Sequence, residues 1–458
     1  MGKKEKPPVA TGEIIQLQID SLNHNGEGVG RISGYAVFVP GALPGELVQA
    51  KVISLQKNYC RALIESVTQT SPERLEPICD QYTACGGCQL LHLAYGEQLR
   101  LKQKTVEDAL WRIGGLQIPV RPTIGMDEPW HYRNKAQVPV AVQNGEILAG
   151  FYEKRSHNIV NLKRCHLQHP DNDQVAHAVR RILGELKIPA YQENTHTGLV
   201  RHILARTSFS TGNILAVIIT NGRTFPRKEE FVAGLRRAVP NITGIVQNIN
   251  TRKGNTILGP EEIILWGQPW LMETLDGLQF IISPRSFFQV NPLQTEVLYR
   301  KAVEYAALTG SETVFDLYCG SGTISLFLAR GACRVIGVES VEAAIKDARE
   351  NAALNGITNV EFHAGPAEKI VPTLLKEGEK ADVVVVDPPR KGCDAALLDT
   401  MAKMQPQRIV YVSCNPATLA RDLKILHQKG YIPLEAQPVD MFPHTFHVEC
   451  VVLITRNI

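Results

Sequence analysis

The chain has 458 residues, of which 44% are hydrophobic and 21% are charged, and its formal net charge is +3. This composition leaves ample apolar material for folded cores, and no apolar run approaches the length of a membrane span, so we expect no membrane partner. The net charge is too small to indicate a nucleic-acid partner by itself. The length predicts two to four domains. Residues 1–8 are lysine-rich and lack the apolar segment of a secretory signal, which indicates a cytoplasmic protein without a disulfide framework.

Residues 9–67 have the pattern of several short strands separated by glycine and proline turns. Residues 13–19 and 47–53 alternate between apolar and polar side chains, and residues 25–31 form a glycine-rich loop. Closely spaced strands in a segment of this length predict a small OB-like β-barrel. Such barrels bind single-stranded nucleic acid, although a barrel used only for packing is the alternative.

A cysteine cluster follows the predicted barrel. Cys79, Cys85 and Cys88 lie close together in the sequence, and Cys165 is available as a fourth thiol. Four thiolates suit either a zinc ion or an iron–sulfur cluster. The spacing alone slightly favours zinc, because zinc is the commoner structural metal.

Residues 68–280 are predicted to form a central α+β domain that contains this cluster. Residues 94–113 have helical spacing and end at a pair of glycines. We expect this helix to pack on the C-terminal domain. Strand patterns dominate the rest of the segment, with helical patterns at 172–186 and 229–239.

Residues 281–458 change to a regular alternation of strands and helices. Near-continuous apolar strands such as 383–386 indicate burial on both faces, which is typical of a mostly parallel, doubly wound sheet. We therefore predict a C-terminal α/β Rossmann-like domain. In such sheets ligands bind beyond the carboxyl ends of the strands. The expected strands are 313–317, 334–339, 360–363, 382–387, 408–413 and 448–455.

Three features at these strand ends predict a cofactor site. The loop 316–323 contains Gly-x-Gly, Glu339 ends the next strand, and Asp387 ends the fourth. An acid at the position of Glu339 is suited to bind ribose hydroxyls. Alone, Glu339 would be read as a solvated acid and Asp387 as a helix cap. Together the features favour a nucleoside-carrying cofactor, and the missing third glycine favours S-adenosylmethionine over a dinucleotide.

Cys414 and Glu449 are candidate catalytic residues. Cys414 lies just past a buried strand, and a helix expected to start near Thr418 would help to lower its pKa. The alternative for Cys414 is a small packing residue. Glu449 interrupts an apolar final strand, where burial would raise its pKa and suit it to act as a general base.

Four motifs resemble those of the RNA 5-methyluridine methyltransferase family, and the resemblance covers nearly the whole chain. They are Ser-Phe-Phe-Gln-Val-Asn at 286–291, Asp-Pro-Pro-Arg at 387–390, Ser-Cys-Asn-Pro at 413–416 and His-Val-Glu-Cys at 447–450. The resemblance implies that Cys414 is the nucleophile and Glu449 the base. It also implies that S-adenosylmethionine is contacted by Gln289, Tyr318, Glu339 and Asp387.

The resemblance also bears on the N-terminal half. Residues 9–67 resemble a TRAM domain, and the cysteine spacing resembles that of members that carry a 4Fe–4S cluster. A barrel and a cluster together are typical of the 23S ribosomal RNA enzymes, so RNA is the expected partner, with no obligate protein partner. The alternatives are methylation of transfer RNA, amine methylation and a non-catalytic RNA-binding or assembly factor. Amine methylation is disfavoured because Arg390, not an aromatic residue, follows Asp-Pro-Pro.

Overall fold

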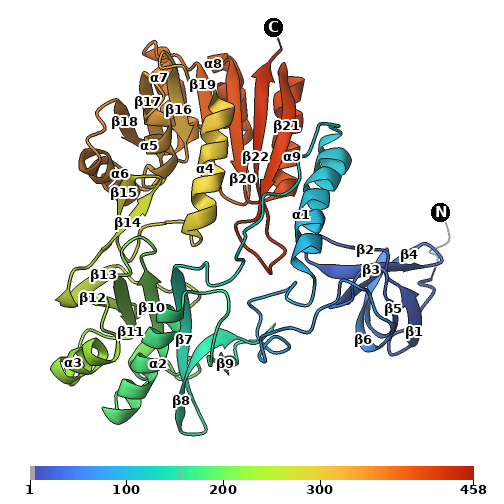
Figure 1. Ribbon diagram of the computed structural model, residues 1–458, viewed down its shortest axis with the longest axis vertical. Coiled ribbons are helices and arrows are strands. Elements are labelled where there is room, and N and C mark those ends of the chain that lie inside the picture. The colour runs from blue at the N-terminus through green and yellow to red at the C-terminus, as the bar shows by residue number, and fades with distance from the viewer. Residues whose placement is uncertain (1–5, 155, 458) are drawn as a thin grey trace.

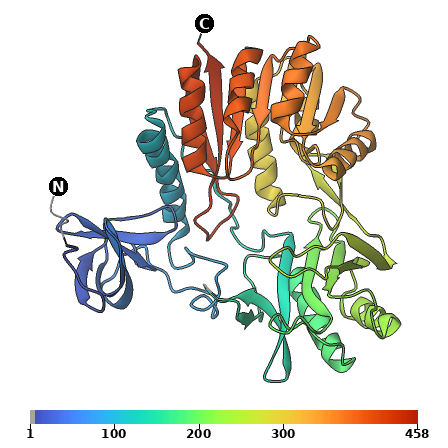
Figure 2. The ribbon, with the colours of Figure 1, turned by 180° about the vertical axis from the view of Figure 1, so that it is seen from behind.

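A computed structural model describes residues 6–154 and 156–457, and its elements form three parts (Figure 1). A small strand-rich part lies at the N-terminus, a second sheet with two helices follows, and a sheet covered by helices on both faces forms the C-terminal part. The same three parts are seen from behind in Figure 2. Residues 1–5, which belong to the lysine-rich start, lie outside the described residues. Within the described residues no helix has the length and apolar character that crossing a membrane requires.

The N-terminal part is a six-stranded sheet in the order β1-β5-β6-β4-β3-β2. The sheet curls so that β3 lies close to β1. A Cβ atom on Gly30 of β3 would lie only 2.3 Å from the carbonyl oxygen of Gln18 of β1, so glycine is needed there. Apolar residues at alternate positions of β5 fill its core. The strands are β1 (Ile14–Gln18), β2 (Ser21–Leu22), β3 (Glu27–Ile32), β4 (Tyr35–Pro40), β5 (Leu47–Leu55) and β6 (Tyr59–Gln69).

The central part is a seven-stranded sheet in the order β13-β12-β11-β10-β7-β8-β9, packed against two helices. A hairpin of β14 (Leu271–Leu275) and β15 (Leu278–Ile282) leads from it into the C-terminal part. Both helices agree with the predicted ranges to within two residues. The elements are β7 (Lys135–Gln143), β8 (Glu146–Tyr152), β9 (Ile159–Asn161), α2 (Pro170–Glu185), β10 (Val200–Thr207), β11 (Ile214–Thr220), α3 (Lys228–Ala238), β12 (Ile242–Ile249) and β13 (Glu261–Gly267).

The C-terminal part is a seven-stranded sheet in the order β18-β17-β16-β19-β20-β22-β21. The first five strands are parallel, and β22 is antiparallel to both of its neighbours. This confirms the predicted α/β domain. The strands are β16 (Thr313–Leu317), β17 (Arg334–Glu339), β18 (Val360–Ala364), β19 (Val383–Val386), β20 (Arg408–Ser413), β21 (Tyr431–Val439) and β22 (Glu449–Arg456). Of these, β21 was not predicted.

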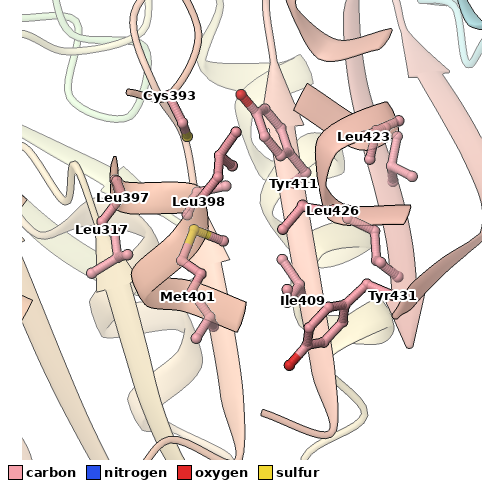
Figure 3. Packing of buried hydrophobic residues seen from close by; sticks show 14 of the residues in the cluster. Leu317, Cys393, Leu397, Leu398, Met401, Ile409, Tyr411, Leu423, Leu426 and Tyr431 are labelled. Carbon is pink, nitrogen blue, oxygen red and sulfur yellow. The ribbon is translucent and has the colours of Figure 1, made fainter. Parts of the chain in front are cut away.

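Helices cover both faces of this sheet. The first face carries α4 (Pro292–Ala306), α5 (Thr323–Ala329) and α6 (Glu342–Leu354). The second carries α7 (Ala367–Lys376), α8 (Ala395–Met404) and α9 (Pro416–Gln428). Figure 3 shows Met401 of α8 and Leu423 of α9 packed around Tyr411 and Ile409 of β20. Continuous burial of the strands on two faces explains their unbroken apolar runs.

Helix α1 (Tyr95–Ala109) joins the second face although it lies far away in the sequence (Figure 1). It continues through a π-helical turn, Leu110–Gly114, and ends where Gly115 takes a φ of 67°. Val106 and Leu110 belong to the same core as residues of α9 and β20. The N-terminal half of the chain is therefore anchored on the C-terminal sheet.

Candidate active site

The loop after β16 turns sharply at the carboxyl edge of the sheet. Tyr318, Gly320 and Gly322 have φ values of 67°, 54° and 79°. A Cβ atom on Gly322 would lie 2.9 Å from the ring of Phe362, so glycine is required there for space as well as for backbone conformation. Glu339, at the end of β17, accepts a hydrogen bond from the backbone N–H of Gly320 at 3.3 Å. The expected glycine loop and its acid therefore lie in contact.

A buried carboxyl group lies in β16, just before this loop. Asp316 of β16 accepts a hydrogen bond from the hydroxyl of Ser325 at 2.5 Å, and its other oxygen is buried with no hydrogen-bond partner among the residues that the structure describes. Burial, followed by the nearby charges of Asp387 and Glu339, raises the pKa of Asp316 to about 7. Burial raises the pKa of Asp387 to about 6. Asp316, Glu339 and Asp387 thus lie close together, and of these Asp316 was missed as a site residue.

Cys414 lies between β20 and α9, at the same edge. The N-cap of α9 is Asn415, whose side chain accepts a hydrogen bond from the backbone N–H of Ala417 at 3.1 Å. Burial, Glu449 and Asp387 together raise the pKa of Cys414 to about 11, and Arg390 opposes them. Burial and the two carboxyl groups therefore outweigh the groups that lower the pKa of this thiol. The helix begins at Pro416, two residues before the expected start.

Glu449 is the first residue of β22 and is only 5% exposed. Because Ser413 pairs with Cys450 in the β20–β22 register, Cys414 and Glu449 lie at the same end of adjacent strands. Burial first, and then Asp387, raises the pKa of Glu449 well above its usual value, while Arg390 lowers it. This carboxyl group has the raised pKa expected of a buried general base.

Gln289 and Tyr318 lie on the loops that flank this edge. Gln289 is buried, and its carbonyl oxygen accepts a hydrogen bond from the side chain of Asn134 at 3.1 Å. The loop that carries it is tied to α6, because the hydroxyl of Ser286 donates to Asp347 at 2.8 Å. Tyr318 is half-buried, and burial raises its pKa above the usual value. Both residues are held by packing around the strand ends.

Family models match two parts of the chain. The model described as tRNA (Uracil-5-)-methyltransferase matches residues 276–457, and a TRAM domain model matches residues 8–64. A protein of Halalkalibacterium halodurans named as an RNA methyltransferase is 50% identical over 452 residues, which are 98% of this chain and 99% of that protein. A Clostridium tetani protein of the same description is 47% identical over 452 residues, or 99% and 98% of the two chains. The chain belongs to the RNA uracil-5-methyltransferase family.

A solved structure agrees with this assignment. The Pyrococcus abyssi tRNA (uracil-54, C5)-methyltransferase, determined in complex with S-adenosyl-L-homocysteine, is 29% identical with a TM-score of 0.78. The similarity covers 96% of this chain and 100% of that one. The protein is thus an S-adenosylmethionine-dependent RNA methyltransferase with an N-terminal TRAM domain, which confirms the predicted family and architecture.

In this RNA methyltransferase the four cysteines of the predicted cluster gather in one region. Burial raises the pKa of Cys88 to about 12, and Cys165, Cys85 and Cys79 lie close enough to add to this rise. Within residues 6–154 and 156–457, however, no three His, Cys, Asp or Glu side chains have a spacing that suits a single metal ion. The four thiols therefore lie near one another, but in the described residues they are not arranged as the ligands of a single metal ion.

Proposed function

We propose that this enzyme methylates carbon 5 of a specific uridine in RNA, through a covalent bond between Cys414 and carbon 6 of the base. The observation that carries the proposal is the juxtaposition of Cys414 and Glu449 at adjacent strand ends, with Asp387 acting on the pKa of both. A nucleophile and a buried base beside a cofactor loop are what this reaction needs.

In the proposed reaction the thiolate of Cys414 adds to carbon 6, and the electron pair of the double bond passes to carbon 5 as an enolate. Carbon 5 then takes the methyl group from the sulfonium, which leaves as the neutral thioether. The carboxylate of Glu449 removes the proton from carbon 5, the double bond forms again, and the bond from carbon 6 to sulfur breaks. Splitting one difficult step into easier ones is the advantage of this covalent route.

The cofactor is proposed to lie across the glycine loop. Glu339 would accept hydrogen bonds from the ribose hydroxyls, and Asp387, Gln289 and Tyr318 would line the rest of the site. The position of Glu339 beside Gly320 supports this arrangement, because glycine allows a ligand to approach the backbone closely.

We assign 23S ribosomal RNA as the substrate, in the cytoplasm, because the TRAM domain is combined with the cysteine cluster. A cavity of about 680 Å³ beside α2 supports a polyanionic substrate, since it is lined by several basic side chains. These include Lys163, Arg164, Arg180 and Arg181, and the lining also contains the carboxyl group of Asp173. The similar archaeal enzyme acts on tRNA, which makes transfer RNA the second candidate.

The reaction is tested by comparing two variants. Cys414→Ala should abolish methyl transfer and leave S-adenosylmethionine affinity near normal. Glu449→Gln should still form the bond to carbon 6 and accept the methyl group, but the cysteine should not leave. A methylated protein–RNA adduct should therefore survive denaturing electrophoresis. Methylation by Cys414→Ala would refute the covalent route, and normal turnover by Glu449→Gln would refute its role as the base.

The substrate is tested with labelled S-adenosylmethionine and total RNA from cells that lack the enzyme. Label in 23S ribosomal RNA supports the assignment, whereas label in transfer RNA selects the second candidate. No label in either would favour a non-catalytic RNA-binding factor.

We further propose that Cys79, Cys85, Cys88 and Cys165 hold a 4Fe–4S cluster, which four thiolates are suited to bind. Protein purified without oxygen should be brown and contain about four irons per chain. Replacing Cys85 should lower folding yield or RNA affinity more than cofactor affinity. Stoichiometric zinc without iron would refute the proposal.

A further inference from the structure

The segment 440–448 connects β21 to β22, and Glu449 follows it as the first residue of β22. Val439, the last residue of β21, pairs with Glu449, the first residue of β22. Asp440 is therefore the next residue after the partner of the proposed base. Whatever fixes Asp440 also fixes the end of the hairpin at which Glu449 lies.

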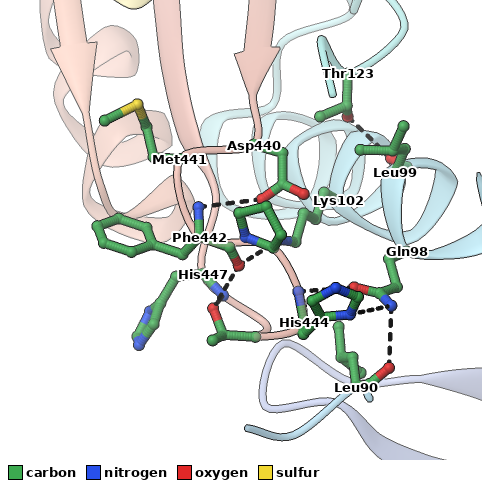
Figure 4. Close-up of polar contacts among 12 residues, drawn as sticks. Leu90, Gln98, Leu99, Lys102, Thr123, Asp440, Met441, Phe442, His444 and His447 are labelled. Carbon is green, nitrogen blue, oxygen red and sulfur yellow. Dashed lines mark hydrogen bonds and ion pairs between the residues drawn. The ribbon is translucent and has the colours of Figure 1, made fainter. Parts of the chain in front are cut away.

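Asp440 is held by a buried ion pair with helix α1 (Figure 4). The ammonium group of Lys102 donates to Asp440 Oδ1 at 2.5 Å and to the carbonyl oxygen of Phe442 at 3.0 Å. Both charged side chains are 0% exposed. The other carboxylate oxygen, Oδ2, accepts a hydrogen bond from the hydroxyl of Tyr95 at 3.0 Å. A residue from the N-terminal half thus reaches into the base of the C-terminal hairpin.

His444, in the middle of the segment, is held by the N-terminal half as well (Figure 4). Its backbone N–H donates to the side chain of Gln98 at 2.9 Å, and its ring stacks on Trp130 with centroids 3.9 Å apart. Its carbonyl oxygen accepts hydrogen bonds from the backbone of Gln89 and Leu90 at 3.1 and 3.0 Å. These two residues directly follow the cysteine cluster, so the cluster region touches the segment through the backbone.

The complete burial of the Lys102–Asp440 ion pair is not explained by stability alone. Removing two charges from water costs about as much as their attraction returns, so such a pair adds little net stability. The pair does restrict the orientation of the two side chains, because each buried charge needs its hydrogen-bond partners in place. Lys102 donates to both the carboxylate of Asp440 and the carbonyl oxygen of Phe442, which restricts the position of the segment and the backbone turn between these two residues.

We propose that Lys102 and Asp440 are positioning residues for Glu449, holding segment 440–448 so that the carboxylate reaches the proton on carbon 5. This inference rests on the proposed function of Glu449. It predicts that loss of the pair slows proton removal selectively. Formation of the bond by Cys414 and binding of the cofactor depend on other loops and should change little.

The test follows the two halves of the reaction in a single turnover of the full-length enzyme. The RNA is 23S ribosomal RNA carrying tritium at carbon 5 of uridine, taken from cells that lack the enzyme. Methyl incorporation reports attack and transfer, and tritium release reports proton removal. In Lys102→Met, tritium release should slow by about tenfold to a hundredfold while methyl incorporation changes far less, because misplacement of a catalytic group by about 1 Å has an effect of this size. The methylated adduct should accumulate.

Two further variants separate positioning from general damage. Lys104→Met, on the same helix, removes a lysine that is 64% exposed and forms an ion pair with the neighbouring Asp108, so it should behave as the wild type. If Lys102→Met does not fold, Lys102→Met combined with Asp440→Asn removes both charges, keeps the shapes and should show the same selective slowing.

A double-mutant cycle with Glu449→Gln supplies the decisive comparison. If Lys102 acts through Glu449, Lys102→Met should slow tritium release little further once the base is gone. The inference would be overturned if the rate reductions of the two single variants multiplied in the double variant. Equal slowing of methyl incorporation and tritium release in Lys102→Met would overturn it as well. A wild-type enzyme that gives neither 5-methyluridine nor an adduct with 5-fluorouridine RNA would refute the proposed function instead.

Discussion

Asp316→Asn should change how the stability of the catalytic domain depends on pH. In the native protein Asp316 is wholly buried, one of its oxygens has no hydrogen-bond partner within residues 6–154 and 156–457, and burial raises its pKa to about 7. The unfolded chain ionises near pH 4. Because the folded-state pKa is the higher one, the stabilising contribution of the proton is complete below about pH 4 and is lost as pH rises through 7.

The magnitude follows from these two pKa values. Raising a pKa from about 4 to about 7 corresponds to about 4 kcal/mol, at about 1.36 kcal/mol for each pKa unit. Between pH 5 and pH 8 the ionisation of Asp316 should lower the free energy of unfolding of the wild type by about 2.5 kcal/mol. This decrease should be absent in Asp316→Asn, whose side chain cannot ionise. For a domain of this size that difference corresponds to roughly 5–10 °C in the melting temperature.

Thermal melts of the full chain, followed by a fluorescent dye at pH 5, 6, 7 and 8, measure this difference. The melting temperature of the wild type should fall relative to Asp316→Asn as pH rises. A constant offset, arising from the unpaired amide, does not affect the test. Glu342→Gln, an exposed change in the first turn of α6, is the control. A difference between Asp316→Asn and the wild type that is the same at every pH would refute the reasoning.

Three further outcomes are expected. Glu339→Ala should weaken S-adenosylmethionine binding by about tenfold or more in calorimetry, since one lost hydrogen bond to a charged group is worth roughly 1.5–3 kcal/mol; unchanged affinity would make Glu339 only a strand-end acid. With its pKa raised to about 11, Cys414 should be alkylated by iodoacetamide slowly at pH 7.5 and faster as pH rises, and more slowly than the exposed Cys333, as peptide mass spectrometry can measure. Gly322→Ala should lower the melting temperature more than Gly320→Ala, because only at Gly322 would a Cβ atom also meet a neighbouring ring at 2.9 Å.

The sequence predicts the C-terminal sheet well because its signal is local. The apolar run at 383–386 reflects burial on both faces, and the observed β19 coincides with it. Strand β21 was missed for an equally physical reason. Pro433 and Pro438 interrupt its pattern, and proline is tolerated because β21 lies at the edge of the sheet, beyond β22.

The candidate site was predictable where its residues stand at the ends of recognisable strands. Asp316 could have been found, because a carboxylate inside an apolar strand requires a partner or a function. The pair of Lys102 and Asp440 could not, since 338 residues separate them and no local pattern marks either one. The raised pKa of Cys414 could not be predicted, because its causes are burial and two acids from other strands, whereas only the neighbouring helix is visible in the local sequence.

The raised pKa values of Cys414 and Glu449 bear on the order of events in the proposed reaction. Burial raises the pKa of both groups; Glu449 and Asp387 raise that of Cys414 further, and Asp387 raises that of Glu449 further, so the site disfavours two negative charges at once. The reaction does not require them at once. When Glu449 has to accept the proton as a carboxylate, the sulfur of Cys414 is already bonded to carbon 6 and carries no charge. A cleft that resists double ionisation is therefore compatible with thiolate and carboxylate chemistry, provided that the two are used in succession.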